Sequence, residues 1–107
     1  MALKPSYNDK LHLPGLSKTE ILILVLEASQ KLEWNIEEVT PEGARFEVPF
    51  NMYSHGEEIT FTIEPGSDGE VAVRSQSSSV QFVDYGKNRK NIQKLRETME
   101  EIKTSLT

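Results

Sequence analysis

The sequence of 107 residues contains no cysteine and no hydrophobic run long enough to cross a membrane. The absence of cysteine excludes a disulfide framework, a thiolate zinc site and cysteine catalysis. The most hydrophobic run extends from Ile21 to Leu26, whereas a membrane-spanning helix needs about 20 apolar residues. The N-terminal segment also lacks the apolar core of a secretory signal. We therefore expect a cytoplasmic protein with no membrane span.

Positive charge is scarce as well. Lysine and arginine number 12 against 17 acidic residues, which gives a formal net charge of -5. This balance argues against a general nucleic-acid binder, because such binding depends on neutralising phosphates. The charge is nevertheless polarised, since residues 27–70 contain only two basic residues, Lys31 and Arg45. The net value is thus an average over an acidic region and a basic one.

The length predicts a single domain covering residues 1–107, and the composition lies within the globular range. We expect residues 1–6 to be disordered. We expect a first strand from Tyr7 to Leu13, ended by a Pro-Gly dipeptide. A capping-box pattern, Ser17 to Glu20, then predicts a helix that runs to about Leu32.

From Trp34 onward the apolar period changes from helical spacing to two, which is typical of strands. Apolar residues alternate with polar ones at Trp34 and Ile36 and over 44–50, 59–64 and 71–74, and we expect them to face the core. A turn with Pro and Gly at 40–43, the connection 51–56 and the loop 65–69 separate these runs. Connections this short require antiparallel pairing. Helical spacing returns from about Lys87 to Ser105. We therefore predict an α+β two-layer sandwich, order β-α-β-β-β-β-α, with a four- to five-stranded antiparallel sheet and both helices on one face.

Three apolar residues of the first helix, Leu22, Ile23 and Leu26, lie off its main apolar stripe. The second helix and the N-terminal strand could cover them. Alternatively they form a partner surface, which would make the protein a homodimer. A third reading is a carrier of a small apolar ligand, which requires a cavity between the sheet and the helices.

No residue pattern predicts catalysis, a metal or a cofactor. His12 and His55 are far apart, and neither has a second histidine nearby to complete a metal site. No nucleophile-elbow motif accompanies the serines, so a serine triad has no support beyond composition. Gly86-Lys87 lacks the earlier glycine and the following Ser or Thr of a phosphate loop. We expect a protein that is not an enzyme.

The most distinctive segment runs from Arg74 to Asn88. Serines cluster at the end of a strand, and Asp-x-Gly-x-Asn follows at residues 84–88. Physically this predicts a structural corner, in which serine hydroxyls bond the backbone, Asp84 caps the helix and pairs with Arg74, and Gly86 adopts a positive φ. Beyond it, basic residues crowd the start of the last helix: Lys87, Arg89, Lys90, Lys94 and Arg96.

The amides and dipole of a helix N-terminus favour anions, whereas basic side chains there are unfavourable without a counter-charge. Acids of the fold, such as Asp84, Glu37, Glu38, Glu57 and Glu58, are one source of that counter-charge. An external anion or an acidic partner is the other. The candidate ligand-binding residues are Arg74, Ser75, Ser77, Asp84, Gly86, Lys87, Asn88, Arg89 and Lys90.

In this segment the chain resembles small uncharacterised bacterial domains with an Arg-Ser-x-Ser strand end, then Asp-x-Gly-x-Asn and a C-terminal helix. The resemblance covers roughly residues 17–95 and implies no established activity. We therefore expect a non-catalytic binding or interaction module that takes an anionic ligand or acidic partner at the start of the last helix. Replacing Lys87, Arg89 and Lys90 together should then weaken that binding.

Overall fold

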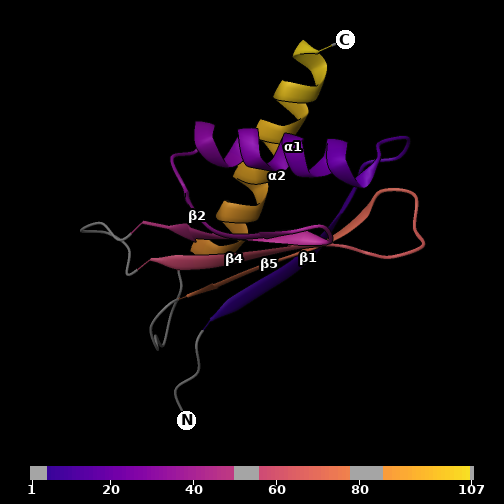
Figure 1. Ribbon diagram of the computed structural model, residues 1–107. Helices are drawn as coiled ribbons and strands as arrows, with labels where there is room; N and C mark the ends of the chain where they lie inside the picture. Colours follow the sequence, from indigo (N-terminus) through magenta and orange to yellow (C-terminus); the bar gives the residue numbers. More distant parts are fainter. Residues whose placement is uncertain (1–4, 50–55, 78–85, 107) are drawn as a thin grey trace.

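The computed structural model describes residues 5–49, 56–77 and 86–106, which form two layers, a sheet and a pair of helices (Figure 1). The elements are β1 (Ser6–His12), α1 (Lys18–Lys31), β2 (Asn35–Thr40), β3 (Gly43–Val48), β4 (Glu57–Ile63), β5 (Glu70–Ser77) and α2 (Lys87–Ser105). All strand pairs are antiparallel, in the spatial order β1-β5-β4-β3-β2. The predicted α+β fold and element order are confirmed, with five strands.

The first strand lies beside the last one, at one edge of the sheet. Its register places Ser6 opposite Gln76 and His12 opposite Glu70. The carbonyl of Pro5 also accepts a hydrogen bond of 2.9 Å from the Ser77 amide. The expected disorder of residues 1–6 therefore does not extend to Ser6, and residues 1–4 lie outside the described part of the chain.

The start of α1 is the predicted capping box. The Ser17 hydroxyl accepts from the Glu20 amide at 3.1 Å, and the Glu20 carboxylate accepts from the Ser17 amide at 2.9 Å. The bond from the Ser17 amide, assisted by the Ser17 hydroxyl, favours the charged carboxylate and holds the pKa of Glu20 below its ordinary value. This reciprocal pair explains why the helix begins at Lys18.

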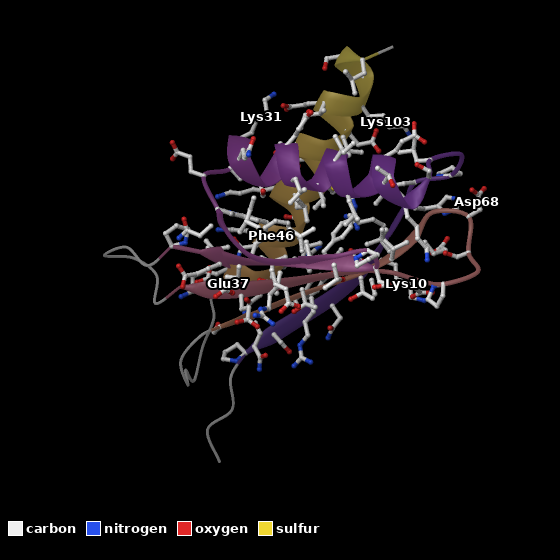
Figure 2. All side chains as sticks on the ribbon, viewed as in Figure 1. Lys10, Lys31, Glu37, Phe46, Asp68 and Lys103 are labelled. Carbon is white, nitrogen blue, oxygen red and sulfur yellow. The ribbon has the colours of Figure 1, made fainter. Side chains whose placement is uncertain are left out.

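One face of the sheet meets both helices, and alternation along the strands decides which residues lie there. Figure 2 shows Phe46 between the sheet and α1. The largest fully buried side chains include Phe46, Phe61, Ile21, Ile59 and Leu95. α1 packs against β2 and β3, and α2 packs against β1 and β5. The core therefore involves both helices and leaves the second face of the sheet open to solvent.

Four apolar residues differ from one another in how well the core covers them. Leu22 and Leu26 are partly buried and pack against the core. Ile23 is 52% exposed. Ile36, which we expected in the core, is 43% exposed because β2 is an edge strand. The predicted inward position of Phe50 lies outside the described residues.

Candidate functional site

Two serines at the end of β5 meet the first turn of α2. Ser75 and Ser77 share the helix-facing side of the strand and are buried, as is Asn88. The Ser75 hydroxyl donates to Asn88 Oδ1 at 2.8 Å. Asn88 Nδ2 donates to Ser77 Oγ at 3.2 Å and to the Pro5 carbonyl at 3.1 Å. The asparagine therefore joins the helix, the last strand and the segment before β1.

A second asparagine extends this cluster toward β4. Asn91 Nδ2 donates to Ser75 Oγ at 3.2 Å and to Glu57 Oε1 at 3.0 Å. Glu57 is only 2% exposed. We call Glu57, Ser75, Ser77, Asn88 and Asn91 the buried polar network. Polar groups removed from water need such partners, so the network fixes the position of α2 on the sheet.

The chemistry of the network is that of a structural anchor. The proton of Ser75 goes to an amide oxygen, which is not a base, so this contact does not activate the hydroxyl as a nucleophile. Of the two histidines, His12 pairs with Glu70 at 2.6 Å, and His55 lies outside the described residues. The described residues also contain no group of three or more histidines and acids that could hold a metal ion.

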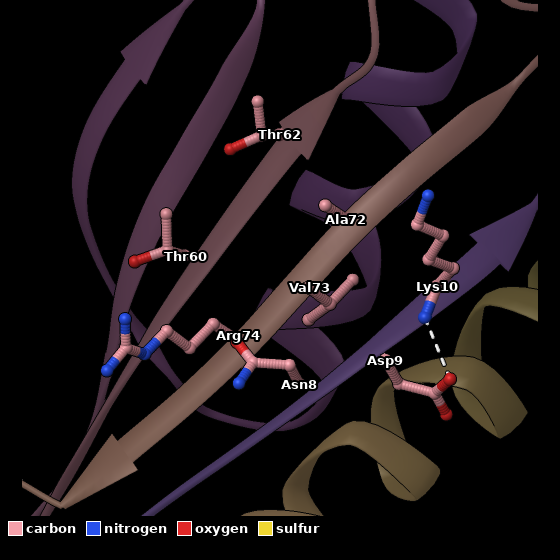
Figure 3. Close-up of a pocket in the computed structure, with 8 residues that line it drawn as sticks. All are labelled: Asn8, Asp9, Lys10, Thr60, Thr62, Ala72, Val73 and Arg74. Carbon is pink, nitrogen blue, oxygen red and sulfur yellow. Dashed lines mark hydrogen bonds between the residues drawn. The ribbon is translucent and has the colours of Figure 1, made fainter.

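The structure separates Arg74 from the serines with which we grouped it. Arg74 is exposed and lies on the open face of the sheet, because successive side chains along a strand point to opposite faces. There it lies in a row with Asn8 and Thr60, in a shallow hollow that also includes Thr62 and Ala72 (Figure 3). The predicted pairing of Arg74 with Asp84 lies outside the described residues.

The remaining predicted residues lie together in the first turn of α2. Gly86 is the N-cap, with the predicted positive φ, here 76°. The predicted capping by Asp84 lies outside the described residues. Lys87 is half-buried, whereas Arg89 and Lys90 are exposed. The helix thus begins with basic side chains and no acidic residue in its first turn.

Part of this positive charge is neutralised by Asp9 on β1. Arg96 Nη2 lies 2.7 Å from Asp9 Oδ2. The Arg96 guanidinium, together with the amide of Lys10 and the charge of Arg89, holds the pKa of Asp9 below its ordinary value. We expected acids such as Glu37 and Glu38 to play this role, but those two lie within 4 Å of Arg45 instead.

Three lysines of α2 have no such partner in the part of the chain that the structure describes. Lys87, Lys90 and Lys94 recur at spacings of three and four, so they line one flank of the helix. None of them forms an ion pair with a described residue, whereas Lys10, Arg45 and Arg96 each do. We call these three residues the lysine stripe. Arg96 and Arg89 project from the opposite flank, toward β1.

The expected site did not include Asn91 or Asp9, and Glu57 was expected only as one of several acids that could supply a counter-charge. Signals for Asn91 and Glu57 were nevertheless present. Asn91 lies four residues before Leu95 and therefore on the buried face of α2. Glu57 lies two residues before Ile59, on the inward face of β4. Asp9 had no local signal, because only the pairing of β1 with β5 brings it beside α2.

The described architecture defines a class: an α+β sandwich domain whose last helix is anchored to the sheet by buried serines and asparagines. The chain belongs to a family described as "Protein of unknown function (DUF1499)", whose sequence model matches residues 5–99. The match covers most of the chain and includes the Arg-Ser-x-Ser and Asp-x-Gly-x-Asn motifs. No curated protein matches the chain. In the described residues, neither helix is long and apolar enough to span a membrane.

Proposed function

We propose that this domain is a non-catalytic interaction module whose lysine stripe binds an acidic segment of a partner or another anionic ligand. The observation that carries the proposal is the charge at Lys87, Lys90 and Lys94, which pairs with no described acid, in a chain whose net charge is -5. Cations near a helix N-terminus meet the positive end of the helix dipole. The fold gains little from these lysines, which favours a role outside the fold.

The arrangement of the lysines suits an extended acidic chain better than a single small anion. Lysines at spacings of three and four follow the helix axis over about two turns. Exposed charges of this kind mainly raise the rate of association and set its dependence on salt. The buried polar network holds this surface in place. Asn88 and Asn91 each follow a stripe lysine along α2, and both bond to serines of β5.

A labelled polyglutamate peptide provides a direct test by fluorescence anisotropy. Replacing all three stripe lysines by glutamine should raise the dissociation constant about tenfold at low salt, because each screened contact contributes modestly. The matched control is K18Q/K31Q/R74Q, which removes the same charge elsewhere and includes the arginine of the open sheet face. The control should change the constant less than about twofold. Equal weakening in the two variants would refute the proposal.

The alternative of an apolar-ligand carrier has less support. Among the described residues, the hollow lined by both β1 and α2 includes Leu11, Leu13 and Met99 and has a volume of about 140 Å³. Sites for small apolar ligands are usually at least about 300 Å³. The homodimer alternative rests on a different surface and is taken up below. The cytoplasmic location expected from the sequence stays a prediction.

A further inference from the structure

An apolar hollow lies between the two helices, on the side away from the sheet. Its volume is about 300 Å³, and the apolar residues that line it are Leu16, Ile23, Leu24 and Leu106. Ile23 is 52% exposed and Leu106 is 76% exposed. In Figure 1 the C-terminal end of α2 extends past α1.

The charged residues around this hollow have both signs, and two of them form no ion pair with a described residue. Glu27 of α1 and Lys103 of α2 both line it, yet neither forms an ion pair with a described residue. Glu20 is the third charged residue there, and it is occupied by the capping box. The rim therefore offers one unused negative and one unused positive charge beside exposed apolar side chains.

We propose that this surface binds a second copy of the chain in a two-fold symmetric dimer. In such a dimer the same patch serves both copies, so each projecting group must meet a complementary feature of the identical patch. The patch meets this condition twice. Ile23 and Leu106 of one copy can fill the hollow of the other, and Glu27 of each copy can face Lys103 of the other.

Charge complementarity within a single patch favours a second copy over an unrelated partner. An acidic partner would place like charge against Glu27, and a basic partner would place like charge against Lys103. The two-fold arrangement pairs each of these residues with an opposite charge. The proposal develops the predicted partner surface but corrects its members. Leu22 and Leu26 pack against the core, so of the three residues only Ile23 is exposed enough to contact a second copy.

Sedimentation of the full chain over a range of concentrations tests this inference. We expect a dimer that the variant I23E/L106E converts to a monomer with an unchanged circular dichroism spectrum. A wild-type chain that stays monomeric at millimolar concentration would overturn the proposal. So would a dimer that survives in I23E/L106E.

A charge exchange distinguishes this dimer from non-specific association. E27K and K103E alone should each raise the dimer dissociation constant about fivefold, because each places like charges opposite one another in both symmetric contacts. The double variant E27K/K103E should return it close to the wild-type value. Additive weakening in the double variant would contradict the two-fold pairing.

Discussion

The anchoring role of Asn88 predicts a large loss of stability when its side chain is truncated. In Asn88→Ala the chain loses the bonds to Ser75, Ser77 and the Pro5 carbonyl, at a residue that is fully buried. Each such bond contributes about 1 kcal/mol net, and a buried partner left unsatisfied costs about 1–3 kcal/mol more. We therefore expect the free energy of unfolding to fall by about 3–5 kcal/mol. A domain of this size has about 5–15 kcal/mol in total.

Urea unfolding followed by fluorescence measures this loss. Trp34 is the only tryptophan, and it is buried with its ring centroid 6.3 Å from that of Phe46. With a slope of about 2 kcal/mol per molar urea, the midpoint should fall by about 2 M. The matched control is Asn35→Ala, which removes one exposed bond of 3.1 Å to Glu47.

The control should lower the free energy of unfolding by less than about 1 kcal/mol, because its partner stays solvated. If Asn88→Ala and Asn35→Ala gave the same midpoint, the network would not anchor α2. The reasoning about its buried bonds would then be refuted.

Two further predictions concern β1 and its surroundings. The pKa of Asp9 is depressed in the folded chain, so its contribution is present at neutral pH and lost as the pH falls below its unfolded value of about 3.9. Asp9→Asn should cost at most about 1 kcal/mol at pH 7, as for other exposed pairs with arginine, and progressively less as the pH falls through the depressed pKa of Asp9. A difference that does not depend on pH would contradict this. Gly69 and Gly66 have φ near +75°, but only at Gly69 would a Cβ overlap the Leu13 carbonyl oxygen. Gly69→Ala should therefore lower the melting temperature further than Gly66→Ala, and equal melting temperatures would show that the contact relaxes without cost.

The fold was predictable because its signals are local and repeated. The capping box at Ser17 predicted the start of α1, and the apolar seam of α2 predicted a helix from Lys87 to Ser105, as found. Alternation around Phe46 and Phe61 also predicted which face of the sheet is buried. Patterns of this kind depend on the spacing of apolar residues along the chain, which can be read directly from the sequence.

The candidate site was only partly predictable, because it depends on contacts between distant segments. The sequence grouped Arg74 with Ser75 by proximity, although alternation in a strand places neighbours on opposite faces. The pairing of Asp9 with Arg96 joins β1 to α2 across most of the chain, and no local pattern predicts it. Predicting the buried polar network would have required the relative positions of β4, β5 and α2.

The central claim is that the exposed flank of α2, rather than the open sheet face, binds acidic partners. Backbone amide spectra recorded during titration with polyglutamate test it most directly. We expect the shifts to concentrate at Lys87, Lys90 and Lys94 and to weaken as salt is added. Shifts centred on Arg74 and Thr60, or the same shifts after the stripe lysines are replaced, would contradict it.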